Sequence, residues 1–147
     1  MFLHHAMFLF AKVLLALFSL QTLSSVEMTS FYDIVEKDLN GNDVLFSQFR
    51  GKIVYIVNVA SQCGYTASNY KLLRDLKRYR EHGLELVIFP CNQFGKQEPG
   101  DEGAISQFAS SQEFEGIVMT KADVNGAQTR PTFKFLKEVT GRGDIRW

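Results

Sequence analysis

The sequence holds two cysteines, Cys63 and Cys91, and Cys63 is the stronger candidate for chemistry. It follows an uncharged, β-branched segment at residues 53–59 and precedes a helical pattern that begins near Ser68. The sequence therefore predicts a thiol at the carboxyl end of a buried strand, where ligand sites of α/β sheets collect. A helix N-terminus close by would favour a thiolate. The alternative is that Cys63 is a small buried hydrophobic residue.

The residues after Cys63 indicate which thiol reactions are possible. Cys63-Gly64-Tyr65-Thr66 has the spacing of a redox Cys-x-x-Cys motif, but threonine takes the second place. No local disulfide can form there. A site with one thiol favours oxidation to sulfenic acid.

Two segments resemble the signature segments of glutathione peroxidases: residues 58–66 (NVASQCGYT) and residues 89–100 (FPCNQFGKQEPG). The resemblance runs from about Ser30 to Trp147. It implies an α/β, thioredoxin-like fold with an N-terminal β-hairpin. It also implies that Cys63 is the peroxidatic residue, in the place that selenocysteine takes in some relatives. The implied reaction is the thiol-dependent reduction of hydrogen peroxide and of organic or lipid hydroperoxides, in the response to oxidative stress.

The same resemblance implies two further catalytic residues. Gln93 matches a family residue whose amide lies beside the reactive atom, and an amide N–H would stabilise a thiolate without carrying charge. Trp147 matches the tryptophan of the family's Trp-Asn-Phe segment, whose indole N–H points at the same atom. The alternatives are a solvated loop glutamine and an ordinary aromatic plug.

Departures from the family pattern affect the expected cycle. Ala109 stands after Gln107-Phe108, where relatives that use thioredoxin-type reductants carry a resolving cysteine. Cys91 matches a position at which relatives carry a cysteine that does not resolve. Glutathione or another external thiol is therefore the expected reductant. The chain also stops at Trp147, without the asparagine expected next and without the C-terminal strands and helix of the family.

These departures leave an alternative function open, in which the chain is a catalytically impaired, truncated isoform that acts as a redox sensor or thiol-relay adaptor. The short connection at residues 141–145 resembles monomeric, phospholipid-hydroperoxide-type relatives, so we expect a monomer. The expected reaction needs no cofactor. No cluster of His, Cys and carboxylates in the sequence has the spacing of metal ligands.

The elements that must position Cys63 follow from hydrophobic periodicity and turn signals. Residues 31–35 and 44–46 flank an Asn-Gly turn at residues 40–43, which predicts a hairpin. Buried strands at residues 53–59 and 84–89 flank an amphipathic helix at residues 68–82. Strand, helix and strand predict a right-handed βαβ unit.

The second half of the chain alternates similar elements. We expect helices at residues 102–110 and 132–139, a strand at residues 117–119 and a turn at Asn125-Gly126. The resemblance implies that the strand at residues 53–59 is central. It would be flanked by the strand at residues 84–89 and by a later antiparallel strand beginning past Trp147.

Composition indicates one globular domain, expected over residues 28–147. The chain has 147 residues, and 16 basic residues balance 16 acidic ones. Because this balance gives no basic footprint, no nucleic-acid partner is expected.

The first 25 residues are expected to form a leader similar to a signal peptide. They contain no acidic residue and include a short apolar run at residues 13–20. This run is too short for a stable membrane span, although a signal anchor is the alternative. Use of the leader would send the chain into the secretory pathway or out of the cell, whereas translation from Met28 would leave it cytoplasmic.

Overall fold

The computed structural model describes residues 30–146. The leader predicted over residues 1–25 and the proposed catalytic residue Trp147 lie outside the described residues. The described chain begins with a 3-10 helix at Phe31–Asp33. The predicted hairpin then follows as β1 (Val35–Lys37) paired antiparallel with β2 (Asp43–Leu45), so its first strand starts four residues later than predicted.

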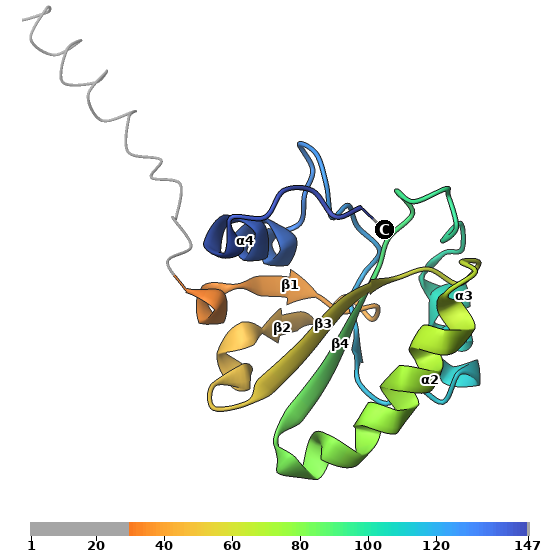
Figure 1. Ribbon diagram of the computed structural model, residues 1–147, viewed down its shortest axis with the longest axis horizontal. Coiled ribbons are helices and arrows are strands. Elements are labelled where there is room, and N and C mark those ends of the chain that lie inside the picture. The colour runs from red at the N-terminus through yellow and green to blue at the C-terminus, as the bar shows by residue number, and fades with distance from the viewer. Residues whose placement is uncertain (1–29, 147) are drawn as a thin grey trace, which may run out of the picture.

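The predicted βαβ unit is present and forms the centre of the fold (Figure 1). Strand β3 (Ile53–Val59) leads into α2 (Thr66–Leu76), a 3-10 helix continues at Lys77–His82, and β4 (Leu84–Pro90) returns parallel to β3. Gly83 ends the helical segment with a φ of 86°, a conformation that glycine adopts at little cost.

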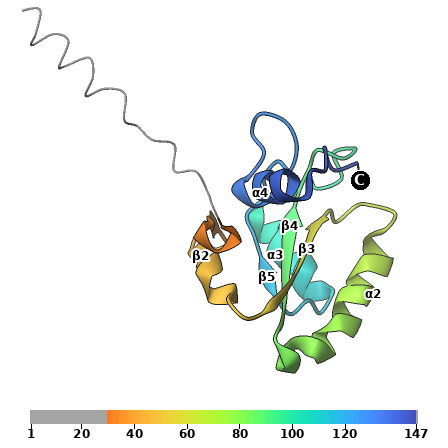
Figure 2. The same ribbon diagram turned by 60° about the vertical axis from the view of Figure 1, so that its left-hand side comes forward.

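The remaining elements also match the predicted positions. They are α3 (Glu102–Ser111), β5 (Ile117–Val118) and α4 (Pro131–Thr140). Strand β5 pairs parallel with β4, so the sheet has the order β3-β4-β5. Helix α4 lies with the hairpin on one side of the sheet, and α2 and α3 lie on the other side (Figures 1 and 2).

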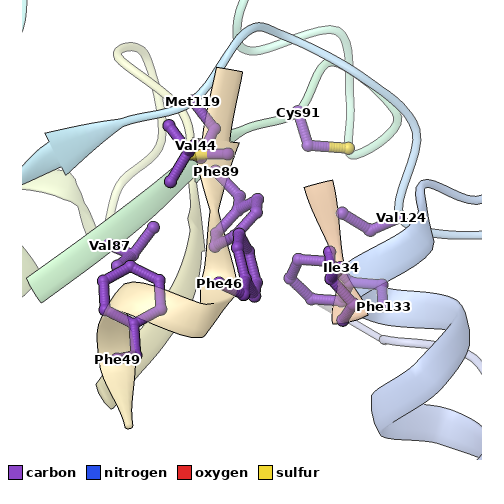
Figure 3. Packing of buried hydrophobic residues seen from close by; sticks show 10 residues of the cluster. All are labelled: Ile34, Val44, Phe46, Phe49, Val87, Phe89, Cys91, Met119, Val124 and Phe133. Atoms are coloured by element: carbon purple, nitrogen blue, oxygen red, sulfur yellow. The ribbon is translucent and has the colours of Figure 1, made fainter. Parts of the chain in front are cut away.

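Strand β4 supplies both hydrophobic cores because its side chains alternate between the two faces of the sheet. Leu86 and Ile88 pack with residues of α2 and α3. Val87 and Phe89 pack with the hairpin and α4, in the cluster that Figure 3 shows. The α/β, thioredoxin-like fold predicted from the sequence is thereby confirmed.

Strand β3 is less buried than its sequence indicated, because only Val59 is buried and Ile53 is 70% exposed. The second neighbour expected for β3 would begin past Trp147, outside the described residues. Within residues 30–146, β4 has a strand on each side and β3 has one only on the β4 side. A run of β-branched residues indicates a strand but does not reveal how many neighbours the strand has.

Candidate functional site

Cys63 lies in the turn between β3 and α2, at the carboxyl end of the parallel strands. Thr66, the first residue of α2, closes this turn in two ways. Its backbone N–H donates to the Cys63 carbonyl at 3.0 Å, and its hydroxyl donates to the Ala60 carbonyl at 2.6 Å. Cys63 is partly exposed and is not in a disulfide. The fold therefore places this thiol at the strand end, as predicted.

Cys63 opens onto a pocket of about 320 Å³. The pocket is formed by the end of β3, the first turns of α2 and the segment after β4. Its lining is mainly apolar and aromatic, with a few amide and hydroxyl groups: Val57, Asn58, Val59, Ala60, Cys63, Tyr65, Thr66, Asn69, Tyr70, Cys91, Phe94 and Gln97. Such a lining, apolar with a few polar groups, is typical of pockets that bind small molecules.

The segment after β4 is bonded to the turn that carries Cys63. The Gln62 N–H donates to the Gln97 carbonyl at 3.0 Å. The Ser61 N–H and hydroxyl donate to the two carboxylate oxygens of Glu98, at 2.9 and 2.7 Å. Glu98 is only 2% exposed. These contacts bring residues of the two signature segments into one site.

Gln97 is the functional candidate that the sequence reasoning missed. It lines the Cys63 pocket, and its Oε1 is the only buried side-chain N or O atom without a hydrogen-bond partner among residues 30–146. Gly95 and Lys96 have positive φ values of 61° and 55°, so the chain turns sharply just before Gln97. A non-glycine residue in this conformation is a common feature of functional sites. The signal available in the sequence was the glycine within a segment that contains two glutamines.

Gln93, the glutamine expected beside the Cys63 sulfur, has other partners in the structure. Its Oε1 accepts from the N–H groups of Val124 and Asn125 at 2.9 Å each, and its Nε2 donates to the Asn125 carbonyl at 2.9 Å. The Cys91 thiol also donates to this Oε1, at 3.6 Å. Gln93 does not line the Cys63 pocket. The side-chain amide of Gln93 is thus hydrogen-bonded to the loop after β5.

Cys91 is fully buried at the end of β4, in the cluster that Figure 3 shows. Its N–H donates to the Val59 carbonyl at 3.0 Å, which extends the parallel pairing of β3 and β4 by one step. Cys91 also contributes to the lining of the Cys63 pocket. Both thiols thus border one cavity, but only Cys63 is in a partly exposed turn.

The approach to Trp147 is held by the loop that Gln93 closes. The Asn125 side chain donates to the Ile145 carbonyl at 2.8 Å and accepts from the Ile145 N–H at 2.9 Å. Lys137 of α4 pairs with Asp144 at 2.9 Å. Asn125 and Lys137, which also contact each other, therefore hold the segment that leads towards Trp147.

Tyr70 is a buried titratable group of the site. Burial raises its pKa well above the usual range, and the charge of Glu98 raises it further. Tyr70 is 3% exposed and lines the pocket from α2. Its phenol consequently remains protonated and neutral at physiological pH.

The described part of the chain contains neither a cluster of metal ligands nor a helix that could span a membrane. Residues 30–146 contain no group of three or more His, Cys, Asp or Glu residues that could hold a metal ion. None of the helices in that range combines the length and apolar character that crossing a membrane requires.

The sequence of the chain is similar to named plant proteins. It is 50% identical over 129 residues to an Arabidopsis thaliana protein named "Probable phospholipid hydroperoxide glutathione peroxidase 6, mitochondrial", covering 84% of this chain and 56% of that protein. It is 44% identical over 135 residues to phospholipid hydroperoxide glutathione peroxidase 1, chloroplastic, of the same plant, covering 88% of this chain and 57% of that protein. The chain thus spans a little over half the length of these two relatives.

Solved structures and a family-wide sequence comparison point to the same group. The crystal structure of T. cruzi GPX1 is similar with a TM-score of 0.61 and 30% identity, over 81% of this chain and 74% of that one. A second crystal structure, of Trgpx in apo form, gives a TM-score of 0.62 and 31% identity, over 82% of this chain and 74% of that one. The sequence model of the family described as glutathione peroxidase matches residues 31–137. The chain therefore belongs to the glutathione peroxidase family.

Proposed function

We propose that this protein is a thiol-dependent peroxidase that reduces hydrogen peroxide and organic or lipid hydroperoxides through Cys63. The observation that carries the proposal is the partly exposed Cys63 at a mainly apolar pocket that Gln97 also lines. Membership of the family and the names of the plant relatives support it. The physiological role that follows is protection against oxidative stress.

The first chemical step is nucleophilic attack by the Cys63 thiolate on the distal oxygen of the hydroperoxide. The O–O bond breaks, the sulfur becomes a sulfenic acid, and the alkoxide leaves as an alcohol, or as water from hydrogen peroxide, after taking up a proton. Gln97 is the proposed polar contact for the reacting atoms, because it lines the pocket and its Oε1 has no hydrogen-bond partner within residues 30–146. Trp147 is proposed to add its indole N–H.

The second half of the cycle needs two external thiols. One thiol condenses with the sulfenic acid, which releases water and forms a mixed disulfide, and a second thiol attacks that disulfide and restores Cys63. Glutathione fits this role because Ala109, which has no thiol, stands at the position where the family resemblance would place a resolving cysteine. We propose that the enzyme works without a metal or prosthetic group and as a monomer.

We propose the cellular compartment of the protein from its leader. Residues 1–25 would direct the chain into the secretory pathway, and translation from Met28 would give a cytoplasmic form. Two of the relatives are named as mitochondrial and chloroplastic proteins. A reporter fused to residues 1–30 tests the leader. Secretory-pathway fluorescence would support it, and fluorescence confined to an organelle or the cytosol would contradict it.

The experiment that tests the function measures peroxide consumed per protein chain with glutathione as the reductant. We expect many turnovers by the wild type, none by Cys63→Ser, and most of the activity in Cys91→Ser, because a serine hydroxyl is a poor nucleophile at neutral pH. A redox sensor or thiol-relay adaptor would instead consume a single equivalent of peroxide. Equal losses of activity in Cys63→Ser and Cys91→Ser would contradict the assignment of Cys63 as the single catalytic thiol.

A further inference from the structure

Glu98 is a buried acidic residue whose carboxylate makes an unusual set of contacts. It is 2% exposed, and its two oxygens accept from the N–H and the hydroxyl of Ser61. It has no ion pair among the contacts found in residues 30–146. A carboxylate buried without a cation is costly, so its bonds to a single neighbouring residue indicate a specific role.

The surroundings hold Glu98 in one place. Its N–H donates to the Asn92 side-chain oxygen at 2.9 Å, which closes the sharp turn between the two residues. Its carbonyl accepts from the Lys121 ammonium at 3.3 Å, and the same ammonium donates to the Gly100 carbonyl at 2.5 Å. Glu98 is therefore fixed on both sides along its own segment, and its side chain extends from this support to Ser61.

Ser61 lies two residues before Cys63, and Gln97 lies one residue before Glu98. The Ser61–Glu98 bonds and the bond from the Gln62 N–H to the Gln97 carbonyl form two adjacent links between the two segments. On its other side, Cys63 is held by the bond from the Thr66 N–H to its carbonyl. The distance between Cys63 and Gln97 therefore depends on these links.

We propose that Glu98 is a positioning residue that holds the Cys63 turn at a fixed distance from Gln97, and that the rate of peroxide reduction depends on it. Glu98 does not line the pocket, so it acts through Ser61 and the backbone and not on the substrate. This inference rests on the proposed peroxidase function. A displacement of about 1 Å between reacting groups can lower a rate by about 100-fold.

The test compares two reactions of Cys63 in the wild type and in Glu98→Gln. The first is sulfenic acid formation with hydrogen peroxide in a single turnover, followed by mass spectrometry of the Cys63 peptide. The second is alkylation by iodoacetamide, which needs an accessible thiolate but no partner group for an O–O bond. We expect Glu98→Gln to lower the peroxide rate by about 10- to 100-fold and to leave alkylation near the wild-type rate.

Glu102→Gln is the matched control, because Glu102 is an exposed carboxylate at the start of α3, four residues along the chain. It should leave both rates unchanged. If Glu98→Gln folds and reacts with peroxide as fast as Glu102→Gln, the proposal is overturned. Equal losses in both reactions would also overturn it, since these would indicate altered ionisation or access and not altered positioning.

Ser61→Ala keeps the inference testable if Glu98→Gln does not fold. This variant removes the hydroxyl donor but keeps the N–H bond to Glu98. We therefore expect a smaller decrease in the peroxide rate, again without a decrease in the alkylation rate. An unchanged peroxide rate would overturn the proposal. A wild type that reacts with peroxide no faster than its unfolded chain would refute the peroxidase function. Hydrogen exchange then tests the links alone: faster exchange of the backbone amides at positions 61 and 62 in Ser61→Ala supports them, and unchanged exchange overturns them.

Discussion

At the scale of single residues, the two glutamines after β4 have different surroundings. Gln97 faces the Cys63 pocket with a buried oxygen that has no hydrogen-bond partner, whereas each polar atom of the Gln93 amide is bonded to the loop after β5. An unpartnered polar atom in the pocket of the proposed peroxidatic thiol is available for a substrate, and a fully bonded one is not. Removal of the Gln97 side chain should therefore affect the rate of peroxide reduction, whereas removal of the Gln93 side chain should affect stability.

Replacing Gln97 by alanine should lower the single-turnover rate of peroxide reduction by roughly 100-fold, the usual effect of removing one preorganised polar group from an active site. Gln93→Ala is the matched variant. It leaves the Val124 and Asn125 N–H groups without their acceptor, so it should lower the free energy of unfolding by about 1–3 kcal/mol. Denaturant unfolding and stopped-flow oxidation measure the two effects. If folded Gln93→Ala lost more of the peroxide reduction rate than Gln97→Ala, Gln93 and not Gln97 would be the catalytic glutamine.

Tyr70 gives a prediction about pH. Burial, and after it the charge of Glu98, raises the pKa of Tyr70 above its ordinary value of 10.0. The unfolded chain therefore loses this proton at lower pH than the folded chain, and the contribution to stability is complete below about pH 10 and is lost as pH rises further. We expect the wild type to lose more stability than Tyr70→Phe between about pH 8 and about pH 11. Urea unfolding at both pH values provides the check, and parallel losses would contradict the assignment.

At the scale of elements, a buried ion pair joins the hairpin to α4. Glu36 of β1 accepts from the Arg130 Nε at 2.6 Å, and from the N–H and hydroxyl of Thr132 at 2.7 and 2.6 Å. The guanidinium carbon of Arg130 also lies over the Phe89 ring, 4.5 Å from the ring centroid. One carboxylate thus holds the start of α4 against β1 and next to the core.

Removing one partner of this pair should be strongly destabilising. Glu36→Ala leaves the Arg130 charge buried at 4% exposure, so we expect a loss of about 3–5 kcal/mol in the free energy of unfolding. Asp43→Ala is the control, since the Lys37–Asp43 pair of the same hairpin is more than half exposed and should contribute at most about 1 kcal/mol. Equal losses in chemical denaturation would show that burial of the Glu36 pair has no special effect.

Most elements could be predicted from the sequence because their signals are local. The alternation and length of apolar runs indicated β3, α2 and β4, and Gly83 marked the end of the helical segment. The Glu36–Arg130 contact could not be predicted because it joins residues 94 positions apart. Gln97 was missed for a related reason. Its approach to Cys63 depends on the backbone turn at Gly95 and Lys96, and a sequence pattern does not show where such a turn points.

At the scale of the whole molecule, the fold brings the functional groups to one end of the sheet. The two hydrophobic clusters lie on opposite faces of β4 and fix its direction, and the turn with Cys63 and the segment with Gln97 and Glu98 both leave the carboxyl ends of paired strands. Links between these two segments then complete the pocket. Cys91 borders the same pocket but belongs to a core cluster, so the two thiols should differ sharply in reactivity.

The central claim is that Cys63 is the residue that peroxide oxidises, and site-resolved oxidation tests it most directly. The folded protein is mixed with one equivalent of hydrogen peroxide, sulfenic acid is trapped with dimedone, and the Cys63 and Cys91 peptides are quantified over time by mass spectrometry. The account predicts that Cys63 is trapped first and much faster than in the unfolded chain, while Cys91 stays reduced. Oxidation of Cys91 first, or of Cys63 no faster than in the unfolded chain, would contradict it.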